Sequence, residues 1–218
     1  MPTRIVLIHA TRVSIDPILE VFRQEWPQAE PVSILDDSLS TDVASAGSLT
    51  PDITRRIVSL AQYGRDIGAA AVLFTCSAFG KAIDEARESL SIPVLKPNEA
   101  LFETALSEGS RLGLLVTFGP SVQSLEAEFY ELAHRQGSTV RLKSILVEGA
   151  MAALAEGDAE THNRLLAEAA QRLSGCDAVM LAQISTSQAL PKVRQAIDCP
   201  VLTSPHSAVA RLKEMIDT

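Results

Sequence analysis

Cys76 has the side chain best suited to chemistry in this 218-residue sequence. It lies between Thr75 and Ser77, directly after the apolar run 71–74 and before a helical pattern over residues 78–90. A thiol at a helix N-terminus is expected to have a lowered pKa, and the larger thiolate fraction suits a nucleophile or a carbon base. The alternative is that Cys76 packs as a small buried hydrophobic residue.

The other two cysteines, Cys176 and Cys199, each come just before an apolar run. They are therefore expected at the N-terminal ends of strands, away from the edge where parallel sheets bind ligands. We interpret both as structural. Because the cysteines are widely spaced and odd in number, we expect free thiols rather than disulfides.

Two of the four histidines, His9 and His206, follow apolar runs and are expected at the carboxyl ends of strands. His206 comes after Thr203-Ser204-Pro205, where its imidazole could orient a carboxylate or move a proton. Helix capping is the alternative. His134 and His162 lie in polar helical patterns and are expected to face solvent.

Adjacent carboxylates at Asp36 and Asp37 resemble an acid/base pair, but neighbouring residues that leave a strand usually diverge. A helix cap or a turn is the expected role. The sequence has no glycine-rich phosphate loop, Walker motif or metal-ligand spacing. We therefore expect neither a cofactor nor a metal.

These residues must be positioned by short apolar runs that alternate with longer helical patterns. A helix is expected over residues 50–67, because Thr50 followed by Pro51 is typical of a helix start and Ile53 and Ile57 follow at helical spacing. The alternation predicts mainly parallel α/β sheets flanked by helices. The expected strands are 5–9, 32–35, 71–74 and 94–95 in the first half and 112–116, 140–145, 178–181 and 201–202 in the second.

One constant offset in residue number relates the two halves. It links three separated pairs of positions at strand ends: Arg4 with Arg111, Cys76 with Gln183, and Pro93 with Pro200. We infer two pseudo-symmetric Rossmann-like halves, with one continuous doubly wound sheet as the alternative. The first lobe is expected to comprise residues 1–97 with a C-terminal helix 206–218, and the second lobe residues 98–205.

Ligands of parallel α/β sheets bind beyond the carboxyl ends of the strands, so the site is expected there and between the two halves. The loops at these ends are rich in hydroxyls, which suits a small carboxylate whose negative charge N–H and O–H donors stabilise. Capping of strand ends and helices is the alternative role for the same side chains. The candidate substrate-binding residues are Thr11, Thr75, Ser77, Thr117, Ser185 and Thr186.

Composition narrows the classes of partner. The formal net charge is −8 and no cluster of Lys and Arg stands out along the sequence, so neither nucleic acid nor an anionic membrane is expected as a partner. No segment approaches the roughly 20 apolar residues of a membrane-spanning helix. We expect a cytoplasmic protein.

At these residues the sequence resembles the aspartate/glutamate/hydantoin racemase superfamily, which includes maleate cis-trans isomerase and arylmalonate decarboxylase. The resemblance extends over essentially the whole chain. It rests on the duplicated α/β plan and on the order of four segments: Asp36-Asp37-Ser38, Thr75-Cys76-Ser77, Lys96-Pro97-Asn98-Glu99-Ala100 and Thr203-Ser204-Pro205. It implies a cofactor-independent enzyme, a small carboxylic or amino acid as substrate, and a homodimer or higher homo-oligomer.

Racemases of this superfamily use two cysteines on opposite sides of the substrate's α-carbon, one to remove a proton and the other to return it. Cys76 matches the first cysteine. The constant offset puts Gln183 at the position of the second, where the sequence departs from the racemase pattern. Glutamine has no usable proton near neutral pH.

Three chemistries remain open. Racemisation needs another second acid/base, such as His206, His9 or a water held by Gln183. Decarboxylation of a malonate-like acid needs one proton donor, and cis-trans isomerisation or a lyase reaction could use Cys76 as a covalent nucleophile. A non-catalytic protein that binds a small acid is the alternative from another functional class.

Overall fold

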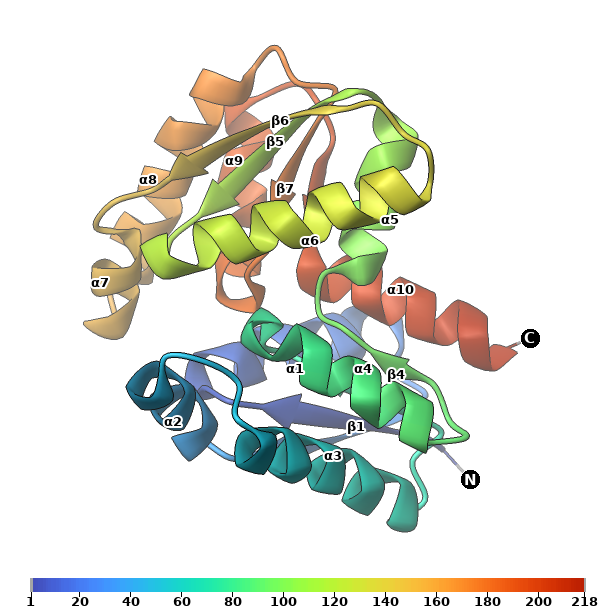
Figure 1. Cartoon of the computed structure of the whole chain (residues 1–218). Helices are drawn as coiled ribbons and strands as arrows, with labels where there is room; N and C mark the ends of the chain where they lie inside the picture. Colours follow the sequence, from blue (N-terminus) through green and yellow to red (C-terminus); the bar gives the residue numbers. More distant parts are fainter. Residues whose placement is uncertain (1, 218) are drawn as a thin grey trace. The chain divides into compact units, whose positions relative to one another are not determined.

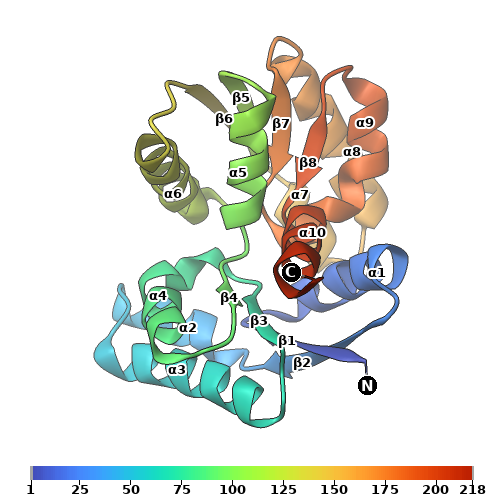
Figure 2. The ribbon, with the colours of Figure 1, turned by 90° about the vertical axis from the view of Figure 1, so that its right-hand side faces the viewer.

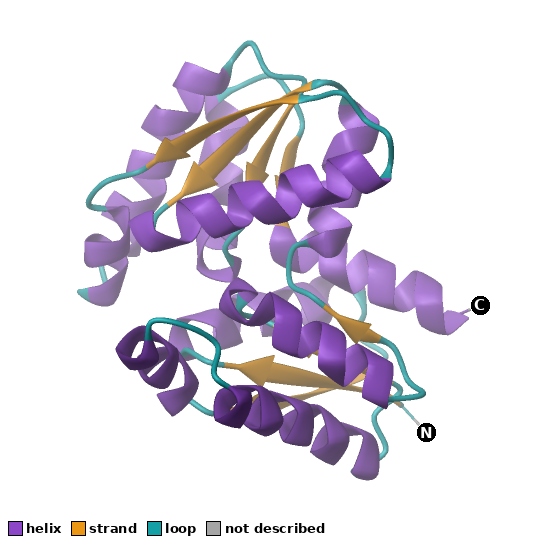
Figure 3. Ribbon diagram, viewed as in Figure 1, coloured by secondary structure: helices purple, strands orange, loops and turns teal. Residues whose placement is uncertain are grey.

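The computed structural model describes residues 2–217, which divide into two compact units (Figures 1 and 3). The first unit comprises the described residues of Met1–Pro97 and Ala208–Thr218, and the second comprises Asn98–Ser207. The boundary near the C-terminus falls inside helix α10 (Ser204–Asp217). Each unit contains one four-stranded parallel sheet flanked by helices, so the predicted α/β fold in two halves is confirmed.

In the first unit the strand order is β2-β1-β3-β4. β3 and β4 coincide with the predicted runs, because both are short and fully buried. β2 begins three residues earlier than predicted, since Ala29 to Pro31 also pair with β1 although they do not form an apolar run. The strands are β1 (Thr3–His9), β2 (Ala29–Leu35), β3 (Ala71–Phe74) and β4 (Val94–Leu95).

One face of the first sheet is covered by the helices that follow β2 and β3. Val6 and Val72 of the sheet share a hydrophobic core with Ile57 of α3 and Ile83 of α4. α3 begins as predicted, with the Thr50 hydroxyl accepting a hydrogen bond from the backbone of Ile53 at 3.3 Å. α1 lies on the other side of the strands (Figure 2). The helices are α1 (Ile15–Glu25), α2 (Ser38–Ala46), α3 (Pro51–Asp66) and α4 (Gly80–Ser89).

The second unit repeats the plan with the strand order β6-β5-β7-β8. Successive residues of β5 point to opposite faces: Leu114 packs in a core with α5 and α6, while Leu115 packs in a core with α8 and α9. The strands are β5 (Arg111–Val116), β6 (Arg141–Leu146), β7 (Ala178–Leu181) and β8 (Val201–Thr203). The helices are α5 (Glu99–Glu108), α6 (Val122–Arg135), α7 (Ala150–Ala155), α8 (Ala159–Ala170) and α9 (Leu190–Ala196).

The strand pairing repeats with the same offset as the sequence. Ile5 pairs with Ala71 in the first unit, and Leu112 pairs with Ala178 in the second. The outer strands β2 and β6 depart from this rule. Arg4 pairs with Glu30 of β2, and the offset would make Gly137 the matching partner of Arg111. Arg111 pairs with Arg141 of β6 instead. The inner strands, which carry the candidate site residues at their ends, therefore keep their spacing.

Candidate active site

Cys76 lies two residues beyond the end of β3, in extended backbone with φ −124° and ψ 125°. A 3-10 turn, Ser77–Phe79, separates it from α4. The side chain is half-buried and packs against the hydrophobic core under α3 and α4. The thiol therefore stands at the carboxyl edge of the sheet, where ligands of this architecture bind.

Burial raises the pKa of the Cys76 thiol above its ordinary value, and a hydrogen bond from the backbone N–H of Ala78 offsets only part of this effect. The prediction of a lowered pKa was wrong. It rested on the helical segment that follows Cys76, whereas burial has the larger effect on the thiol. At neutral pH the thiol carries its proton, which suits a proton donor.

His9, at the end of β1, is fully buried and hydrogen-bonded at both ring nitrogens. Its Nδ1 lies 3.1 Å from Ser14 Oγ and 3.0 Å from Thr75 Oγ1, and its Nε2 lies 3.1 Å from Ser33 Oγ. The cluster links the ends of β1 and β3 to β2. Because Thr75 directly precedes Cys76, the cluster holds the backbone that carries the thiol.

The neighbouring hydroxyl groups favour one tautomer of His9. The Ser14 hydroxyl donates to Thr11 O at 2.8 Å and the Thr75 hydroxyl donates to Ile8 O at 3.2 Å. In the tautomer that fits this use of the two hydroxyl protons, Nδ1–H of His9 donates to Ser14 Oγ and Thr75 Oγ1, and Nε2 accepts from the Ser33 hydroxyl. Burial lowers the pKa of His9 to about 4, so the ring is neutral at physiological pH.

The two serines of this cluster, Ser14 and Ser33, were not predicted from the sequence. They lie 5 and 24 residues from His9 in the sequence and form no local motif with it. Only the pairing of β2 with β1 brings Ser33 to the histidine. Thr75 was predicted to bind substrate, but its hydroxyl is engaged by His9, Ser14 and the backbone.

Gln183 occupies the matching position in the second unit, two residues beyond the end of β7 and also in extended backbone. Its Oε1 accepts hydrogen bonds from the backbone N–H of Thr117 at 2.7 Å and from the Thr117 hydroxyl at 2.9 Å. A backbone N–H can only donate, so this contact identifies the accepting atom as oxygen. Within residues 2–217, Gln183 Nε2 is left without a hydrogen-bond partner.

The remaining candidate hydroxyls fall into two groups. Thr11 is exposed and Ser77 is half-buried, and they follow the neighbouring strands β1 and β3. Ser185 and Thr186 are buried in the 3-10 segment Ile184–Ala189. The Thr186 hydroxyl donates to Gln183 O at 2.7 Å, which matches the capping role named as the alternative.

His206 lies in the first turn of α10, and its Nδ1 is hydrogen-bonded to Oγ1 of Thr203, the last residue of β8. The backbone N–H of His206 donates to the same oxygen at 3.4 Å. Thr203 thus caps the helix and orients the ring. The prediction for His162 was wrong: it is fully buried in α8, where burial lowers its pKa.

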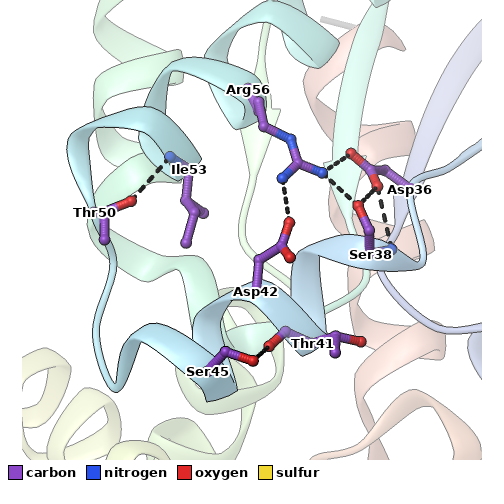
Figure 4. Close-up of polar contacts among 8 residues, drawn as sticks. All are labelled: Asp36, Ser38, Thr41, Asp42, Ser45, Thr50, Ile53 and Arg56. Carbon is purple, nitrogen blue, oxygen red and sulfur yellow. Dashed lines mark hydrogen bonds and ion pairs between the residues drawn. The ribbon is translucent and has the colours of Figure 1, made fainter.

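Asp36 forms a turn rather than an acid/base pair with its neighbour (Figure 4). Its Oδ1 accepts from the backbone N–H of Ser38 at 3.2 Å and from the Ser38 hydroxyl at 2.6 Å. Arg56 of α3 donates to Asp36 Oδ2 at 2.6 Å and also pairs with Asp42 of α2. The predicted turn is confirmed, and the network ties the end of β2 to two helices.

Within residues 2–217, no group of three or more His, Cys, Asp and Glu side chains converges as a metal site would require. In the same part of the chain, no helix is long and apolar enough to cross a membrane.

Comparison with known proteins decides the family. The family model for Asp/Glu/Hydantoin racemase matches residues 9–211. The chain belongs to the Asp/Glu/hydantoin racemase family. A search of curated proteins found no match to the sequence.

Several solved structures are similar to this chain in fold at low sequence identity. Glutamate racemase RacE1 from Bacillus anthracis is 13% identical with a TM-score of 0.73, and the match covers 99% of this chain and 82% of that one. Allantoin racemase from Klebsiella pneumoniae is 14% identical with a TM-score of 0.74, covering 99% and 88%. A cysteine-for-glycine mutant of arylmalonate decarboxylase is 21% identical with a TM-score of 0.67, covering 98% and 93%.

Proposed function

We propose that this protein is a cofactor-independent, racemase-like isomerase that moves a proton at the α-carbon of a small carboxylic or amino acid through Cys76. The observation that carries the proposal is the position of Cys76 beyond the carboxyl end of β3, held by the buried His9 cluster. Family membership supports the class of reaction. Thr11 and Ser77 are the proposed donors to the substrate carboxylate in the first unit.

Racemisation requires a second group that exchanges a proton. Gln183 cannot take this part, because an amide has no usable proton near neutral pH. His206 is our candidate in its place, since Thr203 orients its ring at the end of β8. Imidazole is the side chain most often used for proton transfer.

A second candidate function, decarboxylation of a malonate-like acid by one thiol, is favoured by the bonding of Gln183. The carbon–carboxylate bond would break with its electron pair passing into an enediolate, and the Cys76 thiol would give that carbon its proton. Water would then reprotonate the thiolate. Gln183, with Oε1 held by Thr117, would offer Nε2–H to the negative oxygens.

Proton NMR in deuterated buffer distinguishes these functions. The enzyme is incubated with amino acids, hydroxy acids, maleate and substituted malonates in turn. Deuterium at the α-carbon without loss of mass supports the isomerase, whereas carbon dioxide release with one deuteron incorporated supports the decarboxylase. Absence of turnover across the panel would favour the non-catalytic binding protein.

The matched variants for this assay are Cys76→Ser and Cys199→Ser. Both remove one thiol, but Cys199 precedes β8 at the opposite end of its strand from the candidate site. Turnover should disappear in Cys76→Ser and persist in Cys199→Ser. Full activity in Cys76→Ser would refute the role of the thiol. The expected homo-oligomer is tested by light scattering on the same preparations.

A further inference from the structure

A pocket of about 270 Å³ lies in the second unit where β5 and β6 begin. These are the N-terminal ends of the strands, opposite the carboxyl ends that carry the candidate site residues. Arg111 and Arg141 are direct strand partners there, and Lys143 is two residues further along β6. Arg172 and Cys176 come from the segment between α8 and β7. The full lining is Arg111, Leu112, Arg141, Leu142, Lys143, Arg172, Leu173, Gly175 and Cys176.

The lining brings together four cations in a protein of net charge −8. The sequence shows no basic cluster, because these residues span positions 111 to 172 and only the β5–β6 pairing and the return of the chain after α8 assemble them. The positive charge is a product of the fold. It stands apart from the carboxyl edge of the same sheet, which carries Thr117 and Gln183.

Most of this charge is uncompensated. Arg111 pairs with Asp177, its Nη2 lying 2.6 Å from Oδ1. Lys143 Nζ donates to a backbone carbonyl, Arg172 O, at 2.7 Å, which leaves its charge unpaired. The guanidinium groups of Arg141 and Arg172 have no ion pair or hydrogen bond within the described residues. Within residues 2–217, three of the four positive charges at the pocket therefore have no ion-pair partner, and the nearby Asp177 carboxylate is paired with the fourth, Arg111.

Leu112 and Leu173 of the lining are buried, whereas the four cationic side chains are exposed, so their charges can reach an anion from solvent and are screened by salt. Burial and the neighbouring Asp177 carboxylate raise the pKa of the Cys176 thiol, while Lys143 and Arg111 act to lower it. The thiol can therefore report on any anion that occupies the pocket.

We propose that this pocket binds a phosphoryl-type dianion, either free phosphate or the phosphate group of a small ester. Guanidinium forks match tetrahedral oxyanions that accept several hydrogen bonds at once. A monocarboxylate would neutralise only one of the three unpaired charges, whereas a phosphate dianion neutralises two and presents enough oxygens for all three groups. The site is independent of the α-carbon chemistry proposed above.

Isothermal titration calorimetry with inorganic phosphate, and separately with glycerol 3-phosphate, tests the proposal at constant ionic strength. We expect saturable binding of one equivalent, weakened about tenfold or more in the double variant Arg141→Gln with Arg172→Gln. Tighter binding of the ester than of phosphate would identify a phosphorylated metabolite as the ligand, and equal binding would identify free phosphate. Succinate, a flexible dicarboxylate, should bind more weakly than either.

The control double variant, Arg135→Gln with Arg164→Gln, removes the same charge from exposed helix positions of the same unit. It should bind phosphate as the native protein does. Equal weakening in both double variants would reduce the effect to net charge and overturn the site. Absence of saturable phosphate binding, or equal binding of succinate, would also overturn it.

Alkylation of Cys176 gives a readout that needs neither turnover nor a known ligand. Iodoacetate is an anion and iodoacetamide is neutral, so their rate ratio measures the local positive potential. The ratio should be higher at Cys176 than at Cys199, and it should fall when phosphate is added or when Arg141 and Arg172 are replaced by Gln. An unchanged ratio under both treatments would contradict binding at this pocket.

Discussion

Thr117 donates two hydrogen bonds to Gln183 Oε1, one from its backbone at 2.7 Å and one from its hydroxyl at 2.9 Å. The constant offset between the halves makes Ala10 and Cys76 the equivalent pair in the first unit. At the position where the first unit has the Cys76 thiol, the second unit has the Gln183 amide, whose oxygen is hydrogen-bonded to Thr117. The two units share one fold, but at this position Gln183 can offer only its Nε2–H groups as hydrogen-bond donors.

Gln183→Glu tests the donor role. A carboxylate can still accept both hydrogen bonds from Thr117, but it has no N–H to offer and adds negative charge. We expect kcat to fall by roughly 10²–10³, the usual cost of losing an oxyanion donor. Thr117→Ser keeps both bonds and should retain most activity. Steady-state kinetics on the substrate found by NMR measures kcat of both variants. Near-native kcat in Gln183→Glu would contradict the role of Gln183 as an N–H donor.

The raised pKa of Cys76 predicts a distinctive alkylation profile. Because burial favours the protonated thiol, its reaction with iodoacetamide should be slow at neutral pH and keep rising beyond the pH at which an unstructured cysteine levels off. Mass spectrometry of the Cys76 peptide over a range of pH measures the rate. A short cysteine peptide in the same tube is the control. A plateau at lower pH than in the peptide would show a lowered pKa.

The buried neutral His9 predicts a pH-dependent loss of stability. Between pH 6.5 and about 4 the unfolded chain binds a proton at this residue and the folded chain does not, so the free energy of unfolding falls as the pH falls. His9 accounts for at most about 3 kcal/mol of this fall in the free energy of unfolding. Urea denaturation at several pH values measures the free energy of unfolding. This free energy should change less with pH in His9→Asn than in the native protein.

The control for this prediction is His134→Asn, because His134 is exposed in the last turn of α6. The pH dependence of its stability should match that of the native protein. If the free energy of unfolding of His9→Asn changed with pH between 6.5 and 4 as it does in the native protein, His9 would not cause the loss of stability.

Neighbouring arginines of α3 predict unequal contributions to stability. Arg56 bridges Asp36 and Asp42 and contacts Ser38 (Figure 4). Among the described residues, Arg55 pairs only with the exposed Asp52 one turn earlier. Arg56→Met should lower the free energy of unfolding by about 1 kcal/mol, because a network loses more than an isolated pair. Arg55→Met should change it by less than about 0.5 kcal/mol.

Urea denaturation with and without added salt measures this pair of variants. Salt should weaken the ionic part of the Arg56 network, so the difference between the two variants should narrow as salt is added. If both substitutions lowered the free energy of unfolding equally at low salt, the contacts of Arg56 with the end of β2 and with α2 would add nothing to stability.

Local patterns predicted the inner strands and the position of Cys76 because these depend on short apolar runs that a parallel sheet buries completely. They could not predict properties that depend on residues distant in sequence. The Thr117–Gln183 pair spans 66 residues and the His9–Thr75 contact spans 66, and both form only when neighbouring strands align. The pKa of Cys76 was predicted in the wrong direction because burial outweighs the turn that follows it.

The burial of His162 was missed for a related reason. Its immediate neighbours in the sequence are polar, yet His162 lies on the buried face of α8 together with Leu166 and Ala170. A helical pattern shows which residues share a face, but a single histidine does not indicate which face is buried. The turn at Asp36 was predicted correctly because the carboxylate, the hydroxyl and the backbone N–H it uses lie within three residues.

The division of the chain inside α10 has a consequence for synthesis on the ribosome. Residues 208–217 belong to the first unit, and Val209 and Leu212 are buried, although they are translated after the whole of the second unit. The first unit therefore cannot complete its fold until residues 208–217 have left the ribosome, after the second unit has been made, even though residues 2–97 emerge earlier. This departs from the usual order, in which an N-terminal domain finishes folding while the rest is still being made.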